Sequence, residues 1–90
     1  MGPGREPLTP QRCQEIVVES TPDSGRFTAG SDPAKVTLFD LGVVSSTESV
    51  IFVRAVKRSL APWQINDGDL ASSPDTTVQQ SADSIAQNVF

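Results

Sequence analysis

The large apolar residues of this 90-residue chain are concentrated between positions 36 and 60. They form two runs, which are joined by the short polar stretch Ser45–Glu48. The flanking segments are richer in Pro, Gly, Ser, Asp and Gln, and we do not expect them to fold alone. Residues 36–60 are therefore expected to supply most of the hydrophobic core.

Four segments have the β-branched or alternating composition that is typical of strands. The first, residues 14–20, is rich in Ile and Val, and the turn residues 21–25 separate it from a short second segment, residues 26–29. The third, residues 35–44, carries apolar side chains on both alternating faces. The fourth, residues 50–58, contains consecutive β-branched residues. The pattern predicts a small antiparallel sheet.

The segment 46–60 also fits a helix. Ser45 and Glu48 have the three-residue spacing of a capping box, and Pro62 supplies a stop signal. A helix would leave the dipeptide Val50-Ile51 off its buried stripe, whereas both residues favour a strand. We therefore favour the strand, and a β-β-β-α-α order with this helix is the alternative.

The clearest helix signal covers residues 74–89. Ser73 suits the N-cap position, and Pro74 suits the first turn, where its missing N–H has no helical partner to lose. Four apolar residues recur at the spacing of one helix face: Val78, Ala82, Ile85 and Val89. Together with the sheet, this helix gives an α+β fold in one small domain, residues 14–90.

Residues 1–13 contain three prolines and two glycines and have no apolar period. They are predicted to be a flexible arm, in which Thr9-Pro10 would cap a helix if one begins there. Residues 61–72 are predicted to be a loop that folds Trp63 and Ile65 back over the sheet.

Charge and composition narrow the classes of function. A net charge of −4 disfavours non-specific binding to nucleic acid or anionic membranes. Cys13 is the only cysteine and histidine is absent, so an intrachain disulfide, the commonest metal ligand and the usual neutral-pH base are all missing. No signal peptide or membrane span is recognised. We expect a soluble protein in the reducing cytoplasm, without metal or cofactor.

Few side chains suit catalysis. Asp40 lies in an apolar segment, and the simplest interpretation is a strand end or bulge that faces water. Residues 66–69 resemble a fragment of a calcium loop but lack its full spacing and closing Glu, so a turn is favoured. Three dipeptides fit proline-directed phosphorylation, although turn and cap chemistry explains them more simply: Thr9-Pro10, Thr21-Pro22 and Ser73-Pro74.

These observations favour a non-enzymatic protein-interaction module, such as an adaptor, a regulatory or inhibitory protein, or a subunit of a larger assembly. The apolar residues exceed what one sheet face can hide, and surplus apolar surface is normally covered by another chain or by a second copy. The residues expected to bind this partner are Val78, Ile85, Val89, Phe90 and Trp63.

The alternative is a weak single-stranded nucleic-acid-binding protein. Arg54, Lys57 and Arg58 form the only basic cluster, and Phe52 and Trp63 lie near them in sequence. Cations interleaved with aromatic rings hold single strands by charge and stacking. Three cations on an acidic protein make a weak site, so a solvated face is the simpler interpretation.

Overall fold

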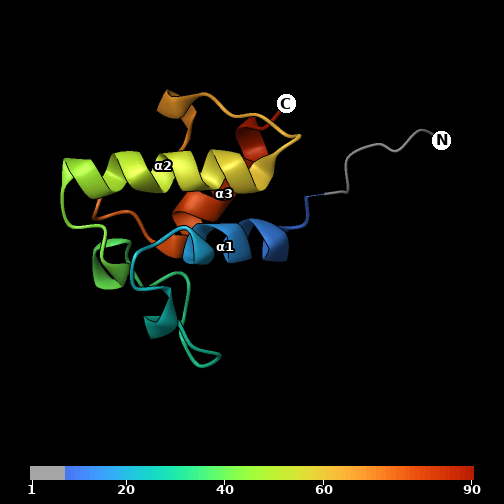
Figure 1. Ribbon diagram of the computed structural model, residues 1–90. Coiled ribbons are helices and arrows are strands. Elements are labelled where there is room, and N and C mark those ends of the chain that lie inside the picture. Colours follow the sequence, from blue (N-terminus) through green and yellow to red (C-terminus); the bar gives the residue numbers. More distant parts are fainter. Residues whose placement is uncertain (1–7) are drawn as a thin grey trace.

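The computed structural model describes residues 8–90 and contains three α-helices joined by long connections (Figure 1). The elements in chain order are α1 (Pro10–Glu19), η1 (Ser24–Arg26), η2 (Phe39–Leu41), α2 (Ser46–Leu60), η3 (Asp67–Asp69) and α3 (Val78–Asn88), where η denotes a 3₁₀ helix. Within residues 8–90 there is no β-strand, and β pairing is limited to one isolated antiparallel bridge between Thr37 and Thr77. The predicted α+β fold with an antiparallel sheet is therefore wrong, because the protein is mostly helical.

The helix α1 occupies the segment that was predicted as the first strand, residues 14–20. Its buried side chains recur at helical spacing, Cys13, Ile16 and Val17, and the C-cap residue Ser20 continues this stripe. Thr9 Oγ1 accepts a hydrogen bond from the Arg12 amide at 3.1 Å, and Pro10 occupies the first turn. The cap and the stripe outweigh the β-branched composition. Of the predicted arm, residues 1–7 lie outside the described residues, and α1 begins within the remainder.

The helix α2 confirms the alternative interpretation of residues 46–60, and the favoured strand over residues 50–58 is wrong. Three side chains share its buried stripe and are at most 2% exposed: Phe52, Val56 and Leu60. A helix satisfies its own backbone hydrogen bonds, whereas a strand needs a neighbour. The expected neighbour, residues 35–44, is broken by η2 and by Gly42, whose φ of 98° is left-handed.

Short backbone pairing between residues 36–39 and 74–78 takes the place of the predicted sheet. The Leu38 amide, for example, donates to the Thr76 carbonyl at 2.8 Å. Residues 26–29, which were predicted as another strand, form the end of η1 and part of a turn. The pairing between residues 36–39 and 74–78 stays short because η2 begins at Phe39 and α3 begins at Val78.

The helix α3 begins at Val78, later than the predicted start at Pro74. Thr77 caps it in place of Ser73: Thr77 Oγ1 accepts from the Gln80 amide at 3.1 Å, and Gln80 Oε1 accepts from the Thr77 amide at 3.0 Å. These two bonds form a complete capping box. The predicted apolar face is confirmed, because three of its side chains are at most 3% exposed: Val78, Ala82 and Ile85.

The core lies between the helices and is completed by residues of the connections. α1 packs mainly against α3, and α2 contributes the stripe that contains Phe52. Five apolar side chains from the connections are at most 4% exposed: Leu38, Leu41, Val43, Ile65 and Leu70. Ile65 and Trp63 do fold back as predicted, but onto a helical core and not onto a sheet. No helix in the described part of the chain is long and apolar enough to span a bilayer.

Candidate functional site

Most of the residues predicted to bind a partner belong to the core. Val78 and Ile85 are 0% exposed, and Val89 and Trp63 are half-buried against the core. Among these five predicted residues only Phe90 is largely exposed, at 56%. The apolar face of α3 therefore stabilises the fold of its own chain, and in this conformation it does not offer a docking surface.

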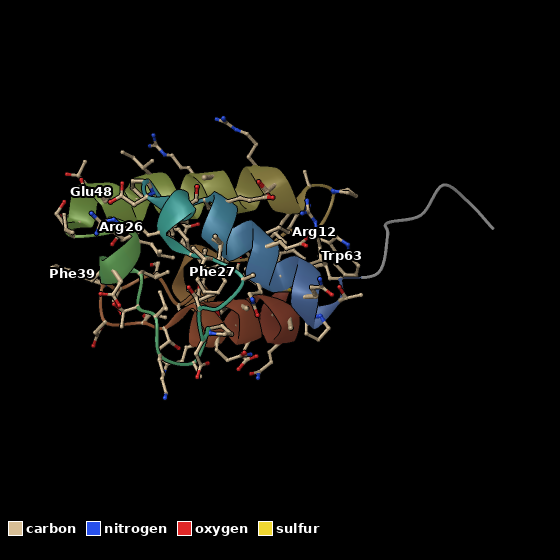
Figure 2. All side chains as sticks on the ribbon, turned by 90° about the horizontal axis from the view of Figure 1, so that it is seen from below. Arg12, Arg26, Phe27, Phe39, Glu48 and Trp63 are labelled. Atoms are coloured by element: carbon tan, nitrogen blue, oxygen red, sulfur yellow. The ribbon has the colours of Figure 1, made fainter. Side chains whose placement is uncertain are left out.

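A different set of large apolar side chains faces solvent near the start of α2. Phe39, Val44, Val50 and Ile51 are each between 52% and 57% exposed. Val44 precedes α2, Val50 and Ile51 lie in its first turns, and Phe39 belongs to η2. Figure 2 shows Phe39 at the same end of the molecule as Glu48, which lies in the first turn of α2.

A groove of about 460 Å³ runs along one side of α2. It is lined by Ser49, Val50, Val53, Arg54 and Lys57 from α2 and by Asp67 and Ser72 from the connection to α3. Ser49 Oγ donates to the Ser72 carbonyl at 3.1 Å, and farther along the helix Lys57 forms an ion pair with Asp67. The groove therefore combines aliphatic side chains with two cations and one carboxylate.

The wall opposite α2 is held in place by serines of α3. Ser81, which is 0% exposed, donates from Oγ to the Ala71 carbonyl at 2.7 Å. The Ala71 amide donates to Ser84 Oγ at 3.0 Å. Both backbone groups of this loop residue are thus satisfied by α3, which fixes the position of the loop beside α2.

The basic cluster lies on the exposed side of α2. Lys57 is paired with Asp67, whereas the guanidinium groups of Arg54 and Arg58 have no ion-pair or hydrogen-bond partner among residues 8–90. Phe52 is 0% exposed and cannot stack on a base. The structure therefore brings the three predicted cations together on one helix, but it separates them from this aromatic ring.

Ser45 differs from the other α-helix N-caps in the described chain. Thr9 and Thr77 accept a hydrogen bond from a backbone amide of their helix, but the Ser45 side chain makes no such bond. Its hydroxyl donates instead to Glu48 Oε1 at 2.8 Å, and the residue is exposed. The positive end of the α2 dipole therefore carries an accessible hydroxyl beside a carboxylate.

The remaining candidates have structural roles. Cys13 is 0% exposed, and burial raises the pKa of its thiol, which is the opposite of what a nucleophile needs. Asp40 is exposed and accepts a hydrogen bond from the Thr37 amide at 3.1 Å. The segment Asp67–Asp69 forms the turn η3, and no cluster of three or more potential metal ligands occurs within residues 8–90.

The exposed residues beside α2 were missed because residues 35–44 and 50–58 were assigned to strands, whose two faces were both expected to be covered. One signal was available in the sequence. If residues 46–60 form a helix, Val50 and Ile51 lie outside its buried stripe, and both residues are exposed in the structure. No comparable signal existed for Phe39 or Val44.

No protein-family model matches the chain, and neither a curated protein nor a solved structure is significantly similar to it. The function is therefore inferred from the geometry of the α2 surface.

Proposed function

We propose that the chain is a non-enzymatic interaction module that docks on another protein through the solvent side of α2. The observation that carries the proposal is the combination of exposed apolar and unpaired basic side chains on one helix. Val50 and Ile51 are each more than half exposed, and Arg54 and Arg58 follow on the same side. Single exposed apolar residues are ordinary, but a contiguous group bordered by arginines is typical of a binding surface.

The charge of α2 defines the chemistry of the partner. The helix carries three cations and one carboxylate, Glu48, although the whole chain has a net charge of −4. A partner with apolar side chains at the centre of its surface and carboxylates at the rim would complement it. Such a partner covers the aliphatic side chains and supplies counter-charges to Arg54 and Arg58.

The proposal is tested by comparing two matched variants in quantitative affinity capture from the native cells. Ile51 and Phe90 are 55% and 56% exposed, so Ile51→Ser and Phe90→Ser each remove one exposed apolar side chain. We expect Ile51→Ser to weaken partner binding by about tenfold, which corresponds to about 1.4 kcal/mol. Phe90→Ser is expected to retain the partner. Retention by Ile51→Ser together with loss in Phe90→Ser would place the docking surface elsewhere.

A second candidate function is the display of a covalently attached group on Ser45. It is favoured by the state of the Ser45 hydroxyl, which is exposed, is not used to cap α2 and donates to the Glu48 carboxylate. A phosphate ester at this position would be stabilised by the free amides and the dipole at the helix N-terminus, which oppose its repulsion by the Glu48 carboxylate. A partner docked on α2 would also reach this hydroxyl.

Intact-mass measurement of protein from the native cells tests this second candidate. We expect an added mass on the wild type that is absent from Ser45→Ala, and its size distinguishes a simple phosphate from a larger phosphate-linked group. A Ser46→Ala variant, which changes the neighbouring serine, is the control and should keep the added mass. Wild-type protein of unmodified mass contradicts this function.

A further inference from the structure

We propose that the surface bound by the α2 side of this chain is the outer face of α1 in a second copy. Copies would then associate head to tail, each α2 docking on the α1 of the next copy. This inference rests on the proposed function, because it uses the same α2 surface, and it identifies the partner. The shape and charge of α1 support a second copy as the partner.

The outer face of α1 carries a shallow pocket of about 200 Å³. Val18 and Phe27 are half-buried, pack on the core and form the apolar part of the pocket. Glu15 and Glu19 lie at its rim with side chains that are 49% and 62% exposed. Figure 2 shows Phe27 beside α1. We call the residues Glu15, Val18, Glu19 and Phe27 the α1 face.

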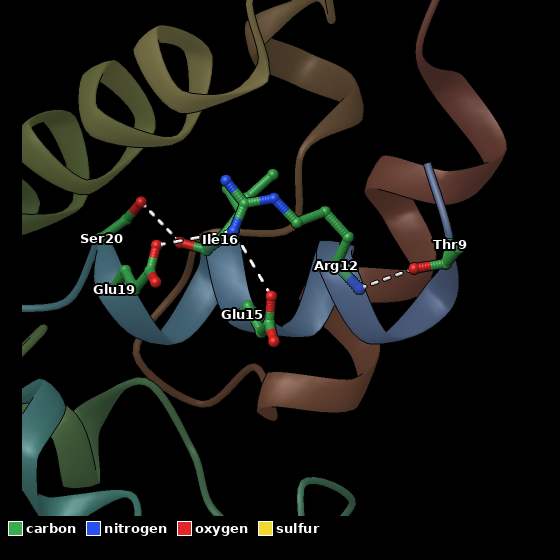
Figure 3. A network of polar contacts seen from close by, with 6 residues as sticks. All are labelled: Thr9, Arg12, Glu15, Ile16, Glu19 and Ser20. Atoms are coloured by element: carbon green, nitrogen blue, oxygen red, sulfur yellow. Dashed lines mark hydrogen bonds and ion pairs between the residues drawn. The ribbon is translucent and has the colours of Figure 1, made fainter. Parts of the chain in front are cut away.

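The α1 face keeps a negative charge within its own chain. Arg12 Nη1 lies 3.4 Å from Glu15 Oε1 and 3.9 Å from Glu19 Oε2. Figure 3 shows the Arg12 guanidinium joined to both carboxylates. One guanidinium cannot neutralise two carboxylates, so the group retains one negative charge. Exposed ion pairs of this kind contribute little to stability, and both carboxylates stay available to cations from another molecule.

The charged residues of the two helices have the same spacing. Glu15 and Glu19 are one helical turn apart, and so are Arg54 and Arg58. When the two helices lie side by side, each guanidinium therefore meets a carboxylate, which is a strong and directional pairing. Ile51 lies on the same stripe as the two arginines and would enter the apolar pocket of the α1 face.

The proposed contact uses two separate surfaces of each copy. They lie on different helices and share no residue, so we expect one copy to offer its α1 face while its own α2 is docked. A contact between two different surfaces is heterologous, and it extends into open chains unless the rotation closes a ring. The average mass should therefore grow with concentration beyond that of a dimer.

Sedimentation velocity of the charge-reversal variants tests this inference. At low salt, the wild type should show an average mass that rises with concentration, and high salt should reverse the rise. Glu15→Arg/Glu19→Arg and Arg54→Glu/Arg58→Glu should each sediment as monomers, because each variant has two surfaces of the same charge. An equimolar mixture of the two variants should associate again, and so should one chain that carries all four substitutions.

Three results would overturn the inference: a wild type that stays monomeric at every concentration in low salt, association that survives either double reversal, or a mixture that stays monomeric. Circular dichroism establishes that the variants are folded. If a reversal unfolds the chain, Glu15→Gln/Glu19→Gln and Arg54→Gln/Arg58→Gln replace the reversals, and each should weaken association at least tenfold. If the sedimentation test overturns self-association, the affinity-capture experiment with Ile51→Ser still decides separately whether α2 docks on a different protein.

Discussion

The helices α1 and α3 form a close pair (Figure 1), whereas α2 makes fewer contacts with other helices. Large apolar residues lie on both the buried and the exposed side of α2. On α1 and α3 the large apolar side chains are buried or half-buried. On α2, Phe52 is 0% exposed while its neighbour Ile51 is 55% exposed. The difference indicates that α1 and α3 chiefly build the core, and that α2 both completes the core and presents a surface.

The largest expected effect compares adjacent residues of α2. Phe52→Ala should lower the free energy of unfolding by about 3–5 kcal/mol, because it removes a fully buried ring and leaves a cavity. Ile51→Ala should change it by about 0.5 kcal/mol or less, since that side chain faces solvent. Urea denaturation followed by circular dichroism measures both values. Equal losses would show that Ile51 belongs to the core and not to a docking surface.

The next effect concerns the connection that leads into α2. Gly42 has a φ of 98°, and a Cβ there would lie 2.9 Å from Asp23 Oδ2. Gly42→Ala should therefore cost about 1–3 kcal/mol of unfolding free energy in the same denaturation experiment. Gly25→Ala is the matched control, because no heavy atom lies within 4 Å of its added methyl group and its φ is not positive. A cost that is no larger at Gly42 than at Gly25 would contradict this geometry.

A smaller effect separates the caps of α2 and α3. Thr77→Ala should cost about 1 kcal/mol because it removes the hydrogen bond from the Gln80 amide. Ser45→Ala should cost less, since the Ser45 side chain makes no bond to the α2 backbone. Thermal or urea unfolding of both variants gives the difference. A larger loss for Ser45→Ala would mean that its hydroxyl caps α2 and is not free for another role.

The smallest effect is the pH dependence of Cys13, which reports on the α1–α3 pair. Burial raises the pKa of its thiol, so in alkaline solution the unfolded chain ionises before the folded chain. The free energy of unfolding should then decrease as the pH rises above the ordinary thiol value of about 8.5. Cys13→Ser should lack this decrease. If an alkylating reagent modified Cys13 in the folded protein as fast as it modifies a free thiol, this would show that α1 and α3 separate readily.

The sequence held correct signals for all three helices in residues 8–90, but not with equal weight. Thr9-Pro10 marked the start of α1, and Ser45 with Pro62 bracketed α2. In the interpretation of the sequence, runs of Val and Ile were given more weight than these signals. Their preference for strands is weak, however, and in the folded protein the packing of the helices overrides it. If Cys13 is counted as apolar, then Cys13, Ile16 and Val17 have the spacing of one helix face.

The start of α3 and the surface residues of the candidate site were harder to predict than the presence of the helices. The start of α3 was missed although Thr77 and Gln80 have the spacing of a capping box, because Ser73-Pro74 offered an earlier start. The exposure of Phe39 depends on which loops cover it, and no local pattern carries that information. The three cations of the basic cluster lie on one helix, α2, but Phe52, which was expected to stack beside them, is 0% exposed.

The most direct test of the docking role of α2 is site-specific photo-crosslinking. A photoreactive amino acid replaces Ile51 in one variant and Gln87, an exposed residue of α3, in another. Both variants are irradiated in the native cells, and cross-links to any other protein chain, including a second copy, are counted by mass spectrometry. If α2 is the docking surface, cross-links should be abundant from Ile51 and few from Gln87. Equal yields, or a higher yield from Gln87, would contradict this role.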